Sequence, residues 1–229
     1  MKIIQDLLHL IYPNQCLVCE CELSPSEQHV CAFCQANLAP TNFNLYKEAS
    51  PMDKLFWGRI DVHSTYAHFF FEKNKGSQNI LFSIKYKDNP SLAIHFGKEV
   101  GKILDKSDLF SSADVVLPVP LHPKKKFIRG YNQSDALAKG ICEAFDCKMD
   151  AKSVIRTKHT ETQTKKSRFQ RWENVNEIFK INASIADYKH AIIVDDVITT
   201  GSTIEAMINE IRKIHPNILI SVVTLAIAK

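Results

Sequence analysis

The sequence lacks a long hydrophobic run, an export signal and any repeated or low-complexity tract. In its 229 residues no apolar stretch approaches the roughly 18 residues that a membrane-spanning helix needs. Residues 1–12 carry Lys2 and Asp6 and have no small-residue cleavage site, so they are typical of an amphipathic helix and not of a signal peptide. We therefore expect no membrane span and a cytoplasmic location.

A strong charge of one sign is also absent. The formal net charge is +4, in a chain that is 45% hydrophobic and 24% charged. This mild basic excess is compatible with phosphate ligands but is not by itself a nucleic-acid signature. The composition excludes global disorder, and the length suits one ordinary domain with a small appendage.

Seven cysteines are present, and five of them lie between residues 16 and 34. An odd number of cysteines without an export signal argues against a disulfide framework and for a reducing compartment. The remaining two, Cys142 and Cys147, are expected to be structural thiols at the end of a helix. The distribution therefore indicates a separate cysteine-based module near the N-terminus.

The cysteine module has the spacing of a zinc site. Two CxxC pairs separated by eleven residues supply the predicted ligands, which are Cys16, Cys19, Cys31 and Cys34. Each CxxC turn brings two sulfurs to one point, and four thiolates at about 2.3 Å close a tetrahedral shell around a structural zinc ion. Cys21 and His29 remain alternative ligands. Such an ion would contribute on the order of 10 kcal/mol to folding.

The rest of the chain alternates between strand-like and helix-like segments. Residues 1–58 are expected to hold the helix, the zinc module and a linker at residues 39–58, and residues 59–229 a second domain. Helical spacing is predicted at residues 76–87, 91–105, 132–145 and 202–214. Strands or a hairpin are predicted at residues 59–73, and single strands at residues 114–120, 152–156, 190–194 and 219–227. This alternation predicts an α/β fold with a mostly parallel sheet flanked by helices.

The most informative stretch is residues 191–203. A short apolar strand is followed by Asp195 and Asp196, then by a loop rich in hydroxyls, then by a helical pattern. Open α/β sheets bind ligands at the carboxyl ends of their strands, and a helix N-terminus presents free N–H groups to anions. The loop residues are Thr199, Thr200, Gly201, Ser202 and Thr203.

These residue types suit a ribose 5-phosphate that carries a pyrophosphate on its first carbon. The two carboxylates can accept hydrogen bonds from the ribose hydroxyls, directly or through Mg²⁺ and its waters. The loop hydroxyls and N–H groups can hold the 5′-phosphate, and Gly201 lets the backbone approach it closely. The alternative is a well-capped strand, turn and helix that binds no ligand.

Residues 191–203 resemble the phosphoribosyl-pyrophosphate (PRPP) binding motif of type I phosphoribosyltransferases. Three further segments extend the resemblance: residues 117–123, residues 129–134, and Arg156-Thr157 with Gln163, Arg171 and Asn174. With the two CxxC pairs, nearly the whole chain resembles the ComF/GntX family. The resemblance implies a phosphoribosyltransferase-like domain that binds PRPP with Mg²⁺, and a link to competence and DNA uptake.

The resemblance also implies roles for basic residues. The turn after Val119, with Arg129 and Gly130, would hold pyrophosphate, and guanidinium groups suit that ligand. Residues 157–171 would form a flexible lid whose Lys165 and Arg168, with Lys166 and Arg171, stabilise the departing pyrophosphate. Catalytic roles are thus expected for Arg129, Lys165 and Arg168. The lysines at 124–126 either add to this charge or form a solvated run.

The acceptor is not identified by any motif. Some purine-specific relatives carry an acid just before the Thr-Gly of the motif, but here that place is Thr199, which cannot act as a general base near neutral pH. The sequence therefore supports PRPP recognition and gives little support to a purine acceptor. The aromatic run at 66–71 either stacks on a base or belongs to the core.

A second hypothesis is a competence factor that binds single-stranded DNA or a helicase partner without catalysis. The zinc module and the basic segments 124–129 and 165–171 motivate it, and it predicts a DNA affinity that falls steeply with salt. A third hypothesis, a PRPP-sensing regulator, finds no helix-turn-helix pattern to support it. The oligomeric state stays open.

Overall fold

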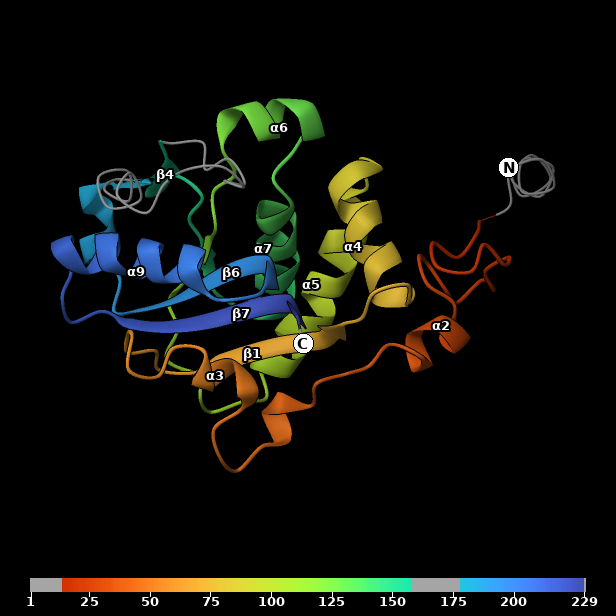
Figure 1. The fold of residues 1–229 in the computed structure, drawn as a ribbon, viewed down its shortest axis with the longest axis horizontal. Helices are drawn as coiled ribbons and strands as arrows, with labels where there is room; N and C mark the ends of the chain where they lie inside the picture. The colour runs from red at the N-terminus through yellow and green to blue at the C-terminus, as the bar shows by residue number, and fades with distance from the viewer. Residues whose placement is uncertain (1–13, 158–177, 229) are drawn as a thin grey trace, which may run out of the picture.

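A computed structural model describes residues 14–157 and 178–228 of the chain (Figure 1). The helix expected at residues 1–12 and nearly all of the expected lid lie outside the described residues. Among the residues that are described, no helix is long and apolar enough to cross a membrane.

Five strands form the main sheet, in the order β1-β7-β6-β2-β3. Their bounds are Thr65–Phe71 (β1), Val115–Pro118 (β2), Lys148–Met149 (β3), His190–Ile198 (β6) and Leu219–Ala228 (β7). Every pairing in this sheet is parallel, which confirms the predicted mostly parallel sheet. Two short strands, β4 (Val154–Arg156) and β5 (Phe179–Ile181), pair antiparallel in a separate sheet.

Helices flank the sheet, as predicted (Figure 1). The longer ones are α4 (Gly76–Tyr86), α5 (Pro90–Leu104), α7 (Gln133–Ala144) and α9 (Ser202–Ile214). The shorter ones are α2 (Ala32–Ala36), α3 (Pro51–Lys54), α6 (Pro123–Arg129) and the 3-10 turns η1 (Phe43–Leu45) and η2 (Ala183–Asp187). Helix α9 connects the neighbouring parallel strands β6 and β7, and its apolar face is buried.

Two strand predictions are corrected by the structure. The segment 59–73 holds one strand, β1, and not a hairpin, because its partner is the last strand β7. Strand β6 does not end at Val194 but continues through both aspartates to Ile198, since β7 runs alongside it and pairs with Asp195, Val197 and Ile198. Tertiary pairing therefore overrides the low strand preference of the two acids.

The segment expected to be a linker, residues 39–58, is packed against the sheet. Helix α3 begins with a capping box in which the Ser50 hydroxyl accepts from the Asp53 N–H, while the Asp53 carboxylate accepts from the Ser50 N–H. Met52 and Phe56 are buried in the core. The division into residues 1–58 and 59–229 stays a prediction. Its boundary lies at the end of the segment that packs against the sheet.

Helices α5 and α7 touch through their backbones. A Cβ atom added to Gly97 would meet the Leu137 carbonyl oxygen at 2.3 Å, and one added to Gly140 would meet the Ile94 carbonyl oxygen at 2.2 Å. No larger residue fits at either position without moving a helix. This contact fixes the place of α7, whose first turn reaches the carboxyl edge of the sheet.

The buried His190 makes the stability of the fold depend on pH. His190 is 1% exposed, its two ring nitrogens contact the hydroxyls of Ser112 (2.7 Å) and Ser221 (2.8 Å), and burial with the nearby His63 lowers its pKa to about 4. The unfolded chain binds this proton near pH 6.5, so the free energy of unfolding falls as the pH drops from 6.5 to 4, by about 3 kcal/mol.

Urea denaturation between pH 4 and 7.5 measures this effect. His190→Gln keeps a polar side chain that does not titrate, so we expect its stability to vary less with pH than that of the wild type. Identical pH profiles for the two proteins would show that His190 does not carry the effect.

Candidate functional site

Two aspartates lie at the carboxyl end of β6, where an α/β sheet presents its ligand site. Successive residues of a strand point to opposite faces, yet both Asp195 and Asp196 line one cavity of about 150 Å³. The other residues that line it come from α4, from the segment after β2, from α6, from the start of α7, from β4 and from the start of α9. The sheet thus gathers segments from distant parts of the sequence around the two predicted acids.

Asp195 is held by the start of α7. Its Oδ1 atom accepts from the Ser134 hydroxyl (3.0 Å) and from the Asp196 N–H (2.9 Å). Burial, followed by the charge of Asp196, raises the pKa of Asp195 to about 7. A cation or hydroxyl-bearing ligand in the cavity would offset the cost of this buried charge.

Asp196 is 5% exposed and pairs with Lys85 at the end of α4, with Nζ 3.0 Å from Oδ2. Lys85 also lines the cavity, but the sequence analysis did not identify it. No motif surrounds it, and only the packing of α4 against the strand edge brings its ammonium group to the acids.

Basic side chains also line the cavity. Lys125, Arg129 and Arg156 line it. The Arg129 guanidinium lies over the Tyr86 ring, 5.4 Å from its centre, and its Nη1 atom is buried without a hydrogen-bond partner. A buried donor without a partner is costly, and an anionic ligand would satisfy it.

The loop at residues 199–203, which is expected to bind an anion and is called the anion loop below, surrounds a small hollow. Asp195 and residues 197–204 line a space of about 50 Å³, which shares Asp195 and Thr203 with the larger cavity. Gly201 has φ +75°, a left-handed conformation that favours glycine, and a Cβ there would meet the Phe56 ring at 3.1 Å. The other loop residues beside this hollow are Thr199, Thr200 and Ser202, and α9 begins at Ser202.

The basic run at 124–126 belongs to α6, a helix that the sequence analysis did not predict. His122 caps it, since the Lys124 N–H donates to His122 Nδ1 at 3.2 Å. Of the three lysines only Lys125 lines the cavity, while Lys126 lies 3.6 Å from Asp135. Gly130 follows the helix and is not among the residues that line either space.

The other two predicted catalytic residues, Lys165 and Arg168, lie outside the described residues, as does most of the predicted lid. Within the described part, the aromatic run at 66–71 belongs to β1, where Tyr66 and Phe69 are buried in the core. This run was expected either to stack on a base or to belong to the core, and the structure places it in a core strand.

The N-terminal cysteines form one cluster. Four sulfurs lie within 4.8 Å of one another, and they belong to Cys16, Cys19, Cys21 and Cys31. Thiolates in this number and spacing suit zinc. Neighbouring N–H and thiol groups lower the pKa of Cys19 to about 6, which favours the ligand form.

Cys34, the fourth predicted ligand, lies in α2 and is buried beside the same cluster. Burial and the adjacent Cys19 and Cys31 thiols raise its pKa well above the usual range. Five thiols are therefore present for four places, and Cys21 remains an alternative to Cys34. His29 instead packs against His95, with ring centres 5.3 Å apart.

Comparisons with known proteins agree with the geometry. The model of a family described as "Phosphoribosyl transferase domain" matches residues 132–229. The chain is 26% identical over 215 residues to DNA utilization protein YhgH of Escherichia coli O157:H7, covering 85% of this chain and 89% of that protein. It is 36% identical over 103 residues to Competence protein F of Haemophilus influenzae, covering 44% of this chain and 45% of that protein.

A similar solved structure is the glutamine PRPP amidotransferase of B. subtilis in complex with ADP and GMP. Its TM-score is 0.41 at 20% sequence identity, and the match covers 62% of this chain but only 30% of that one. The family assignment comes from the matched domain and the two curated relatives. Together these findings support a ComF family protein with the phosphoribosyltransferase fold.

Proposed function

We propose that this protein binds PRPP with Mg²⁺ at the carboxyl edge of its sheet and transfers the phosphoribosyl group to an acceptor. The observation that carries the proposal is the cavity of about 150 Å³, which is lined both by the two aspartates and by Lys125, Arg129 and Arg156. PRPP has the matching distribution of groups, since its hydroxyls need acceptors and its pyrophosphate needs cations.

The two aspartates would bind the ribose and the metal. Asp195 and Asp196 supply the hard oxygen ligands that Mg²⁺ prefers, and the same atoms can accept from the 2′ and 3′ hydroxyls. The metal would supply positive charge to the pyrophosphate. Lys85 holds Asp196 at 3.0 Å and Ser134 holds Asp195, so both carboxylates are oriented before any ligand arrives.

The basic side chains of the cavity would bind the pyrophosphate, and the anion loop would bind the 5′-phosphate. Arg129 lines the cavity and has a buried Nη1 without a hydrogen-bond partner, which would bind pyrophosphate and stabilise the charge that develops as it leaves. Thr199–Thr203 and the start of α9 would hold the 5′-phosphate through hydroxyls, N–H groups and the helix dipole. Lys165 and Arg168 are proposed to complete the pyrophosphate site.

The zinc ion is proposed to be structural. Cys16, Cys19 and Cys31 would hold it with either Cys34 or Cys21, and a closed shell of four thiolates leaves no position for chemistry. The names of the curated relatives support a role in competence and DNA utilization, and we propose that the protein acts in the cytoplasm. The acceptor stays open, with a purine disfavoured because Thr199 is not an acid.

Isothermal titration with PRPP and Mg²⁺ tests this proposal, followed by assay of pyrophosphate release with a panel of nucleobases and ammonia. We expect binding that requires Mg²⁺. A purified, zinc-loaded and folded protein that gives no binding heat would refute it.

A second function is favoured by the surface of α6. None of its residues is buried, and Phe127 and Ile128 are 90% and 82% exposed beside Lys124, Lys125 and Lys126. Exposed aromatic and basic groups in this combination suit single-stranded DNA, since bases stack on rings and phosphates pair with lysines. The protein would then act as a DNA- or helicase-binding competence factor beside, or in place of, catalysis.

Fluorescence anisotropy with a labelled oligonucleotide at several salt concentrations tests the α6 surface. We expect Phe127→Ala to weaken binding about tenfold through lost stacking. Lys124→Ala with Lys126→Ala should lower the salt slope by about two. Phe33→Ala, at another exposed ring (75%) on α2, is the control and should change nothing. Equal effects of the two phenylalanine substitutions would exclude a specific platform on α6.

A further inference from the structure

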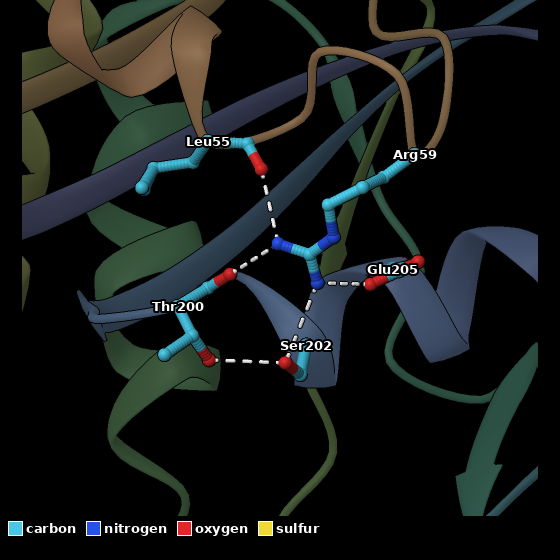
Figure 2. A network of polar contacts seen from close by, with 5 residues as sticks. All are labelled: Leu55, Arg59, Thr200, Ser202 and Glu205. Atoms are coloured by element: carbon cyan, nitrogen blue, oxygen red, sulfur yellow. Dashed lines mark hydrogen bonds and ion pairs between the residues drawn. The ribbon is translucent and has the colours of Figure 1, made fainter.

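Arg59 does not line the cavity, but it connects the segment that follows α3 to the anion loop through hydrogen bonds. Figure 2 shows the Arg59 guanidinium between Leu55 and the start of α9. Its Nη1 donates to the Thr200 carbonyl (2.7 Å) and to the Leu55 carbonyl (3.0 Å), and its Nη2 donates to the Ser202 hydroxyl (3.4 Å). Nη2 also pairs with the Glu205 carboxylate.

The contact with Thr200 fixes the orientation of one peptide group in the loop. The peptide that joins Thr200 to Gly201 is planar and trans, so its C=O and N–H point in opposite directions. Because the C=O points toward Arg59, the Gly201 N–H points away from Arg59. Arg59 lines neither the hollow of the loop nor the larger cavity, so it acts on them through the backbone.

The contact with Glu205 removes an unfavourable charge. Glu205 lies in the first turn of α9, where a carboxylate interacts well with the helix dipole but would repel an anion bound at the same helix end. Arg59 pairs with this carboxylate and so reduces the repulsion. The same guanidinium therefore shapes the loop and offsets the nearest acidic side chain of α9.

We propose that Arg59 is a positioning residue for the anion loop. It holds the loop open for a phosphate group before the ligand arrives and so couples the segment that follows the cysteine module to the binding site. This inference rests on the proposed function, because it assigns the loop to the 5′-phosphate of PRPP.

The experiment compares four variants of the full zinc-loaded protein by titration with PRPP and Mg²⁺ and by thermal unfolding. They are Arg59→Ala, Arg59→Lys, Arg59→Ala with Glu205→Gln, and Arg212→Ala. Arg212 is the matched control, because it also anchors this segment to α9, through the Asp61 carbonyl at 2.8 Å, but does not touch the loop.

We expect Arg59→Ala to weaken PRPP binding by about 10- to 100-fold. Arg59→Lys should regain only part of the affinity, because an ammonium group cannot hold Thr200, Ser202 and Glu205 together. Adding Glu205→Gln to Arg59→Ala should also regain part of the affinity, without raising the unfolding temperature. Arg212→Ala should bind as the wild type does.

Hydrogen exchange of the loop N–H groups, measured without ligand, separates this inference from the proposed function. Faster exchange in residues 199–203 of Arg59→Ala than of Arg212→Ala supports the positioning role, even if the wild type gives no PRPP binding and the proposed function fails. Wild-type exchange in Arg59→Ala would overturn the inference. So would wild-type affinity in Arg59→Ala, or equal losses of affinity in Arg59→Ala and Arg212→Ala.

Discussion

Replacing Cys16 by serine is expected to release the proposed zinc ion and to give the largest loss of stability among the substitutions proposed for this protein. Cys16 is 1% exposed, and its sulfur accepts N–H groups from Val18 (3.4 Å) and Cys31 (3.3 Å) at the centre of the cysteine cluster. Binding of a structural zinc ion is coupled to folding, so the loss of one ligand removes a free energy on the order of 10 kcal/mol from the module.

Zinc content per chain and denaturation monitored by circular dichroism measure this effect. Cys142→Ser is the matched control, because Cys142 is a half-buried thiol outside the cluster, 3.5 Å from Cys147, and its loss should leave the zinc in place. Comparing Cys21→Ser with Cys34→Ser then identifies the fourth ligand as the one whose loss lowers the zinc content. If Cys16→Ser keeps its zinc and unfolds like Cys142→Ser, Cys16 is not a zinc ligand.

Replacing both Asp195 and Asp196 by asparagine is expected to abolish PRPP binding, with at least a hundredfold loss of affinity, while the protein stays folded. Asparagine keeps the shape of the side chain but removes the two negative charges that a ribose and Mg²⁺ need. Titration with PRPP and Mg²⁺ measures the affinity, and circular dichroism measures folding. The free energy of unfolding should fall by less than the total stability of the protein. Lys85 loses its charged partner Asp196 in this variant, but its side chain remains partly exposed to water.

A double substitution with the same change of charge controls for electrostatics at a distance. Asp105 and Asp108 are exposed after the end of α5, so Asp105→Asn with Asp108→Asn should bind PRPP as the wild type does. If the site variant loses its folded structure, the two acids are structural. If it binds PRPP with unchanged affinity, the ligand does not use this strand end.

The part of the fold that local patterns determine was predictable. Four helices were placed to within a few residues, because Asn89-Pro90, Asn132 and the start at Ser202 are strong local signals. The loop at 199–203 was identified by residue type alone. The parallel sheet followed from the alternation of strands with helices.

The features that the sequence analysis missed depend on contacts between distant segments. The extent of β6 is set by β7, the position of Lys85 by the packing of α4, and the approach of Arg59 to Thr200 by the docking of α3 and the chain after it. None of these has a signal within its own stretch of sequence. Helix α6 was missed for another reason, since its exposed apolar residues do not follow the pattern of a buried helical face.

The glycine contact between α5 and α7 has a consequence for how this protein can vary. Ser134, which holds Asp195, stands in the first turn of α7, so its distance from the strand edge is set by main-chain atoms that already touch. Side chains elsewhere can be exchanged and repacked, but an alanine at Gly97 or Gly140 would shift the whole helix. The hydroxyl at position 134 and these two glycines are therefore expected to persist or disappear together as the sequence diverges.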